Sequence, residues 1–212
     1  MPTEIDINEP FGRCIHDTVL KYQLKRNLEI GSWDGEGSTN CFVEAMKQLS
    51  GDLKLYCLEI KKERIESLAR RYKDFPFVVP VWGSSLVYED LVITDFEDIW
   101  NSKFNKIGTC HPKATVRGWF DQDVQQIKKA KRGFLSEYKD ETWDSVLIDG
   151  GEFTGYSEFL KVKDKTKFLF LDDVHNAYKC NQIHYELLDD PQWTLLHDFS
   201  EVRNGASVFK KN

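Results

Sequence analysis

Apolar residues come in short runs, and the segments between these runs have apolar positions three and four residues apart. The runs at 28–30, 53–60, 77–81, 145–148 and 167–171 predict β-strands, and the spacing between them predicts helices. Strands that alternate with helices are typical of a parallel sheet with helices on both of its faces. The pattern therefore predicts an α/β fold.

Two further apolar runs lie near the end of the chain. They cover 193–199 and 206–210 and are separated by Asn204-Gly205, a pair that favours a tight turn. We therefore expect a Rossmann-like, mostly parallel seven-stranded sheet with an antiparallel terminal hairpin. Helices are predicted at 10–26, 61–72 and 177–188.

The segment 86–142 is several times longer than the dozen or so residues that a plain crossover requires. Long insertions of this kind usually form lids or substrate walls. We predict a lid inserted between the third and fourth strands, with a basic helix at 123–138 and Trp119 and Phe120 in the wall. The whole chain, 1–212, is then a single domain with this lid. A basic run in the lid either faces solvent or binds an anionic acceptor: Lys128, Lys129, Lys131 and Arg132.

A glycine-rich loop follows the first strand. Gly31, Gly35 and Gly37 crowd into seven residues, and Ser38 and Thr39 open the next helix. Glycine lets the backbone turn tightly and approach a ligand closely, and a helix start offers unpaired N–H groups. The loop is therefore either a cradle for a nucleotide-like cofactor or an ordinary turn that needs glycine for its geometry.

Acidic residues stand at the ends of three further predicted strands. Glu59 ends the second strand, where a carboxylate can accept both ribose hydroxyls of a nucleoside, or can pair with the basic residues that follow. Asp149 follows the fourth strand, and Asp172 and Asp173 follow the fifth. Parallel strands end at one edge of a sheet, so we expect these three aspartates to converge. They would hold a hard cation such as Mg²⁺, or would only cap their strands.

The glycine loop resembles motif I of the class I S-adenosylmethionine-dependent methyltransferases. Glu29 lies two residues before the first glycine, where nicotinamide sites are usually apolar. Asn40 stands where a dinucleotide loop requires a small residue. The terminal hairpin also resembles the last strand pair of the methyltransferase sheet.

The sequences IDGGE at 148–152 and LDDVH at 171–175 narrow the resemblance. They are similar to the macrocin-type, metal-assisted O-methyltransferases, which have Asp-Gly-Asp-His after strand four and Asp-Asp after strand five. Asp149 and the pair Asp172-Asp173 match that pattern, whereas Gly151 and Glu152 replace its second aspartate and its histidine. The resemblance covers 28–85 and 144–209 and leaves out the lid.

The resemblance implies S-adenosylmethionine as cofactor and O-methylation of a small sugar-like or secondary metabolite. It implies a metal site at Asp149, Asp172 and Asp173. Proton removal is assigned to His175 or Glu152, beside Asp149. The cofactor-binding residues that we expect are Glu29, Gly31, Ser32, Trp33, Gly35, Ser38, Glu59, Ile60, Gly83, Ser84 and Asp149.

Two other functions stay open at this point. One is a nicotinamide-dependent sugar oxidoreductase, which would use the same loop and the same Glu59. The other is a methyltransferase-like binding subunit that has lost activity, which the changes at Gly151 and Glu152 permit.

Composition bears on partners and location. The net charge of −6 does not favour binding to nucleic acid, and no apolar run is long enough to span a bilayer. The beginning of the sequence is polar and acidic, unlike a secretory signal, and the five cysteines are scattered, as in reduced proteins. We expect a cytoplasmic protein with a small-molecule acceptor, without a nucleic-acid or membrane partner, and leave a homo-oligomer open.

Overall fold

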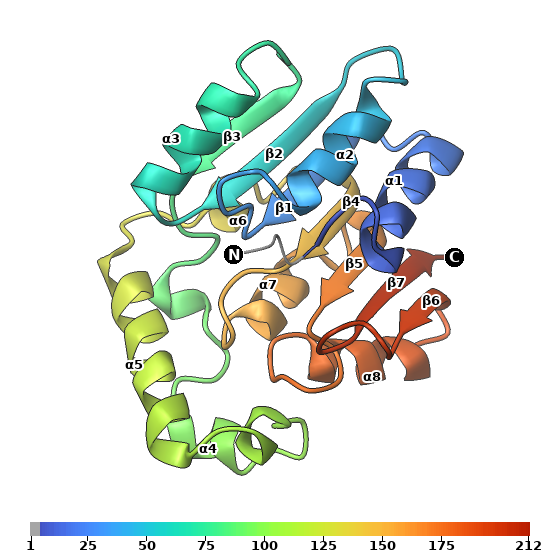
Figure 1. The fold of residues 1–212 in the computed structure, drawn as a ribbon. Helices are drawn as coiled ribbons and strands as arrows, with labels where there is room; N and C mark the ends of the chain where they lie inside the picture. Colours follow the sequence, from blue (N-terminus) through green and yellow to red (C-terminus); the bar gives the residue numbers. More distant parts are fainter. Residues whose placement is uncertain (1–4) are drawn as a thin grey trace.

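The computed structural model describes residues 5–212 and contains one seven-stranded sheet (Figure 1). The strand order is β3-β2-β1-β4-β5-β7-β6; β1 to β5 are parallel, and β7 is antiparallel to both of its neighbours. This confirms the predicted sheet and its terminal hairpin. The strands are β1 (Arg26–Ile30), β2 (Lys54–Glu59), β3 (Val78–Trp82), β4 (Trp143–Ile148), β5 (Thr166–Asp172), β6 (Trp193–Phe199) and β7 (Ala206–Lys211).

Helices cover both faces of this sheet. One face carries α1 (Pro10–Tyr22), α2 (Ser38–Met46) and α3 (Lys62–Arg71). The other carries α6 (Phe134–Glu137), α7 (Gly155–Val162) and α8 (Asn181–Asp189). The first helix is shorter than predicted because Gln23 adopts a left-handed conformation that ends it.

The alternation of side chains along β5 shows how one strand serves both cores. Phe168 and Phe170 belong to the cluster under α1 to α3, whereas Leu169 and Leu171 belong to the cluster under α6 to α8. Successive side chains of a strand point to opposite faces, so a strand covered on both sides is apolar throughout. The buried run in the sequence therefore marks a central strand.

The register of the strands brings four loops to one edge of the sheet. Ile30 pairs with Leu58 on one side and with Ile148 on the other, and Ile148 pairs with Leu171. The loops after β1, β2, β4 and β5 therefore lie together. This is the edge at which open α/β sheets bind ligands.

The inserted segment 86–142, the predicted lid, forms an arm that extends beyond the sheet (Figure 1). It contains a short 3₁₀ turn at Tyr88–Asp90, α4 (Phe96–Trp100), a second such turn at Ile107–Thr109, α5 (Lys113–Lys129) and α6. The single helix predicted at 123–138 is wrong. Gly133 lies so close to Leu86 and Val87 that a Cβ would meet their backbone at 2.9 Å, and its neighbour Phe134 donates its N–H to Ser84. The chain breaks there to join the end of β3.

The arm has a small core of its own. Phe120 of α5 is 5% exposed and packs against Phe96 and Phe153, with ring centroids 5.7 and 5.5 Å apart. The prediction that Phe120 lines a substrate wall is therefore wrong, because its ring fills the contact between the arm and the loop after β4. Among residues 5–212, no helix is both long and apolar enough to cross a membrane.

Candidate active site

The glycine loop after β1 has a geometry that only glycine permits. Gly31 has φ +93°, and a Cβ there would lie 2.1 Å from the carbonyl oxygen of Asp149. Gly35 has φ +85°, and the Tyr72 hydroxyl donates to its carbonyl oxygen at 2.6 Å. These glycines therefore let the loop pass close to the end of β4 and the side of α3.

Glu29 holds this loop from beneath. It is fully buried, and its two carboxylate oxygens accept from Ser38 Oγ at 2.5 Å and from Thr39 Oγ1 at 2.6 Å. Burial raises the pKa of Glu29, and these hydroxyls oppose that rise. Glu29 and Ser38 thus join β1 to α2 below the loop surface. Ser32 is also turned inward, since its Oγ donates to the Leu58 carbonyl at 3.0 Å.

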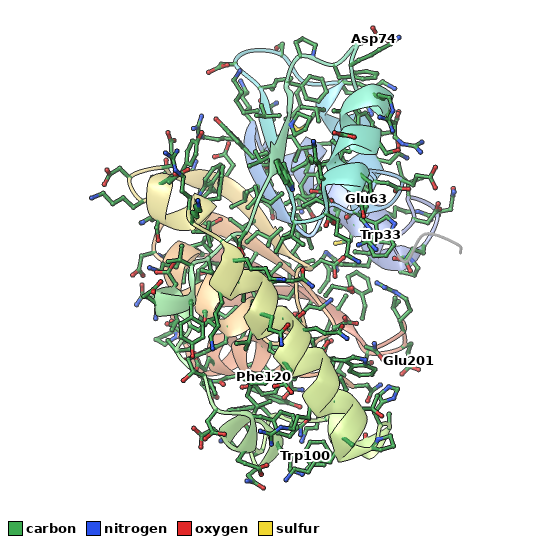
Figure 2. All side chains as sticks on the ribbon, turned by 90° about the vertical axis from the view of Figure 1, so that its left-hand side faces the viewer. Trp33, Glu63, Asp74, Trp100, Phe120 and Glu201 are labelled. Carbon is green, nitrogen blue, oxygen red and sulfur yellow. The ribbon has the colours of Figure 1, made fainter. Side chains whose placement is uncertain are left out.

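Glu59 lies in a rim of exposed apolar side chains at the end of β2. Trp33, Ile60 and Trp82 are 54%, 37% and 61% exposed. Glu59 itself is 6% exposed, and its Oε1 accepts from the N–H of Lys61 at 2.8 Å. Figure 2 shows Trp33 beside the start of α3, where the Arg64 guanidinium lies 3.0 Å from the centre of its ring.

The turn after β3 completes this rim. Gly83 has φ +154°, donates its N–H to the Glu59 carbonyl, and has no atom within 4 Å of the position of a Cβ. The space beside its Cα is therefore open to a ligand. Ser84, in contrast, is buried, and its Oγ accepts from the N–H of Leu86, so it serves the chain turn at the base of the lid.

The acid cluster, Asp149, Asp172 and Asp173, forms as predicted, with one oxygen of each carboxylate within 4.8 Å of the others. A lysine that the sequence did not suggest lies among them. Lys179 Nζ is 2.8 Å from Asp149 Oδ1 and 2.7 Å from Asp173 Oδ2. The third member, Asp172, pairs with Arg203 at 2.8 Å.

Burial and neighbouring charges shift the pKa values of these groups in different directions. Burial, and then the neighbouring carboxylates, raise the pKa of Asp172 well above its usual value. Burial also raises the pKa of Asp149, against the effect of Lys179. For Asp173 burial is outweighed by Lys179 and by the Asn204 amide, so its pKa is lowered. For Lys179 the carboxylates outweigh burial and raise its pKa, so the lysine is a cation and not a base.

The two groups predicted to remove a proton have other partners. Glu152 Oε1 accepts the N–H groups of Tyr178 and Lys179, at 2.7 and 3.3 Å. His175 Nε2 bonds to Asp198 of β6 at 2.9 Å, and its ring packs against His184. The structure therefore brings Glu152 to the backbone beside the acid cluster, and places His175 in a separate group under the terminal hairpin.

Two further carboxyl groups belong to this region and were missed by the sequence analysis. Asp123 comes from α5 of the lid, and its Oδ2 would lie 3.2 Å from a Cβ at Gly151; burial raises its pKa to about 6. Glu158 of α7 accepts from Ser85 Oγ at 2.5 Å and from Thr154 Oγ1 at 3.1 Å; burial raises its pKa to about 7. Neither residue carries a sequence signal, because charged residues on predicted helices usually face solvent.

A hollow of the molecule lies elsewhere. Its volume is about 570 Å³, and it is an open groove between α1 and β6. None of the predicted site residues, all of which the structure describes, lines it. The convergence of loops and charged groups at the edge of the parallel strands is therefore the better candidate site.

No family model matches this chain, and no curated protein matches it. Solved structures do. A methyltransferase from Geobacter sulfurreducens is 11% identical with a TM-score of 0.59, over 98% of this chain and 82% of its own. An O-methyltransferase from Bacillus cereus, in complex with S-adenosylhomocysteine, is 13% identical with a TM-score of 0.56, over 95% and 80%.

A third structure is the O-methyltransferase TomG from Streptomyces achromogenes, involved in tomaymycin synthesis, in complex with S-adenosylmethionine. It is 14% identical with a TM-score of 0.55, over 95% of this chain and 79% of its own. Identities this low report on the arrangement of the chain and not on its chemistry. The protein therefore has the fold of the class I S-adenosylmethionine-dependent methyltransferases.

Proposed function

We propose that this protein is an S-adenosylmethionine-dependent methyltransferase. The observation that carries the proposal is the rim around Glu59, where a buried carboxylate lies among exposed apolar side chains, next to a loop that only glycine can form. Exposed apolar groups gathered at one place mark a binding site, and a carboxylate among them suits a nucleoside. Two of the similar structures were solved with S-adenosylhomocysteine or S-adenosylmethionine.

The residues present fit this cofactor. Glu59 would accept the ribose hydroxyls, and Ile60, Trp82 and the open side of Gly83 would hold the purine. The surface of the glycine loop and the neighbouring Asp149 would face the amino-acid part. Bound there, the cofactor supplies a methyl group on a sulfonium, and the chain supplies position and charge.

We further propose that the acceptor is a small molecule methylated on oxygen, sugar-like or a secondary metabolite. A hydroxyl acceptor must lose its proton, and a base with a pKa near the working pH does this best. Asp123, with a pKa of about 6, stands on the lid beside Gly151. We assign the base to Asp123 on this pKa. Its carboxylate accepts one backbone N–H, from Phe153, whereas Glu152 accepts two and His175 is bonded to Asp198.

The basic run of the lid gives no support for an anionic acceptor. Lys128, Lys129, Lys131 and Arg132 are all exposed. Lys128 lies 4.6 Å from the ring centre of Tyr88, and Arg132 pairs with Glu137 at 3.4 Å. These contacts are those of a solvated helix end, so a neutral acceptor is the better choice.

Calorimetric titration with S-adenosylhomocysteine, S-adenosylmethionine, NAD and NADP tests the cofactor. We expect binding of the first two only. Glu59→Ala should weaken S-adenosylhomocysteine binding by about 1–3 kcal/mol, the scale of a lost hydrogen bond to a charged group. The control is Glu66→Ala, because Glu66 is exposed on α3 and pairs only loosely with Lys62, at 3.7 Å.

Two outcomes would contradict the proposal. Binding of NAD without any response to S-adenosylhomocysteine would favour the oxidoreductase. Binding of S-adenosylmethionine without methyl transfer to any member of a broad panel of hydroxylated acceptors would favour the inactive binding subunit.

A further inference from the structure

We propose that Lys179 occupies, in the acid cluster, the place that a divalent cation would take, so that this site works without a metal ion. The meaning of the inference for catalysis rests on the proposed methyl transfer, but the inference itself concerns only the acid cluster and its counter-charge. Three carboxylates at the ends of neighbouring strands predicted Mg²⁺ at this place. The structure provides a cation of the chain's own.

The position of the ammonium group competes directly with a metal. Lys179 Nζ lies between Asp149 Oδ1 and Asp173 Oδ2, 2.8 and 2.7 Å from them. A Mg²⁺ ion that bridged the same two oxygens would bind each at about 2.0–2.1 Å. Its centre would fall within the volume of the Nζ group, so the ion and the lysine cannot be present together.

Cations of the chain already lie against each of the three carboxylates. Lys179 faces Asp149 and Asp173, and Arg203 bonds to Asp172 at 2.8 Å. Asp173 Oδ1 also accepts from the Asn204 amide at 3.0 Å. Like charges held this close are relieved by a counter-charge or by a retained proton. Here two cations of the chain face the three carboxylates, and the pKa of Asp172 is raised well above its usual value by burial and by the other two aspartates.

Lys179 is held in place and is not a surface side chain that happens to reach the cluster. It is 8% exposed. Its backbone N–H and that of Tyr178 both donate to Glu152 Oε1. Gly155, at the start of α7, lies so close to it that a Cβ there would meet the Lys179 carbonyl oxygen at 2.4 Å.

The lysine also accounts for the two departures from the resembled pattern. Glu152 stands where that pattern has a histidine, and here it binds the backbone that carries Lys179. Gly151 stands where the pattern has an aspartate, and there Asp123 of the lid approaches to 3.2 Å from the position of a Cβ. Both changes therefore serve a site in which the lysine replaces the metal.

Binding of Mn²⁺, followed through the electron paramagnetic resonance of the free ion, tests the inference on the full chain. Mn²⁺ is a probe with the same preference for oxygen ligands as Mg²⁺. We expect the unaltered protein not to bind Mn²⁺ at the acid cluster. Lys179→Ala should bind one ion per chain at least about tenfold more tightly, because the repelling charge is gone from among the three carboxylates. Adding Asp173→Asn to that variant should abolish this binding.

The matched control is Lys161→Ala. Lys161 of α7 pairs with Asp90 of the lid at 2.6 Å. A single carboxylate there cannot hold the ion. Lys179→Gln serves as a second variant that keeps most of the side-chain volume. If neither Lys179 variant folds, the unaltered protein decides: an unchanged melting temperature after EDTA treatment supports the inference.

Three results would overturn it. One is a Mn²⁺ ion bound by the unaltered protein and lost on Asp173→Asn. Another is a folded Lys179→Ala protein that binds no Mn²⁺. The third is a melting temperature that falls with EDTA and is restored by Mn²⁺. None of these measurements uses S-adenosylmethionine, so a failure here is distinct from a failure of the cofactor titration.

Discussion

At the scale of single residues, the site is notable for carboxyl groups buried without a full counter-charge. Glu158 is 1% exposed and is held by two hydroxyls, and its second oxygen, Oε2, has no hydrogen-bond partner among the described residues. A hydroxyl stabilises a carboxylate less than a cation does, so burial prevails and raises the pKa from 4.5 to about 7. Such a group makes folding depend on pH.

The sign of that dependence is fixed by the shift. The folded protein holds the Glu158 proton up to about pH 7, whereas the unfolded chain releases it near 4.5. Stability from this group is therefore full below pH 4.5 and is lost as the pH rises to about 7. The difference in unfolding free energy between Glu158→Gln and the unaltered protein should grow by about 3 kcal/mol, in favour of the variant, as the pH rises across this range. Urea unfolding across pH 4–8 measures it, and parallel curves for the two proteins would refute the shift.

The proposed methyl transfer assigns proton removal to Asp123. Asp123→Asn keeps the size of the side chain and removes the base, so turnover should fall roughly 100-fold or more, the usual scale of general-base catalysis. Affinity for S-adenosylhomocysteine should not change. The rate of the unaltered enzyme should rise with pH through about 6, where Asp123 loses its proton. A variant with full activity and the same pH profile would return the role to Glu152 or His175.

The site residues divide by how far the sequence could identify them. Gly31 and Glu59 could be proposed from the sequence because a strand end and a glycine loop are local patterns. Lys179 was missed because its role depends on three carboxylates from two other segments, and nothing around it in sequence distinguishes it from a solvated lysine. For His175 the sequence could not show the partner of its ring, because Asp198 comes from a distant strand.

At the scale of elements, the lid is attached to the sheet through aromatic contacts. Phe120 of α5 packs against Phe153 in the loop after β4. The ring centroids of Phe153 and Tyr178 are 6.0 Å apart, and Tyr178 precedes Lys179. Figure 2 shows α5 crossing the molecule, with Phe120 along it and Trp100 at the far end of the arm. The position of Asp123 therefore depends on this packing, one turn further along α5.

Phe120→Ala should loosen the lid more than the sheet. Removing a buried phenylalanine costs about 3–5 kcal/mol, and Phe120 is the side chain through which the core of the lid contacts Phe153 outside it. Hydrogen exchange should speed up across 96–129 while β1, β4 and β5 keep their protection. Val92→Ala is the control, because Val92 belongs to the same insertion and is 53% exposed. Equal loss of protection throughout the sheet would show that the arm is part of the main core.

The lid was the element least accessible to sequence analysis. Its presence followed from its length, but the helix predicted at 123–138 ran across Gly133, where the chain returns to the end of β3. Strand positions, in contrast, were predicted to within about two residues, because short apolar runs mark them and the central strands are buried on both faces. Tertiary contacts, and not local spacing, decide where the lid helices begin and end.

At the scale of the whole molecule, the order of the strands determines what meets at the site. β1 and β4 are neighbours at the centre of the sheet, with β2 and β5 on either side, so one edge receives the glycine loop, Glu59 and the acid cluster. The cofactor and the acceptor would thus be held by different loops on a rigid frame. The lid brings Asp123 from a third direction.

The structure of the protein with S-adenosylhomocysteine bound tests this arrangement most directly. The account predicts the ribose at Glu59, the purine at Ile60 and Trp82, the amino-acid part along Gly31 to Gly35, and the sulfur facing Asp149 and Lys179. It predicts no metal peak among the three aspartates. A ligand in the groove between α1 and β6, or a divalent ion in place of the Lys179 ammonium, would contradict it.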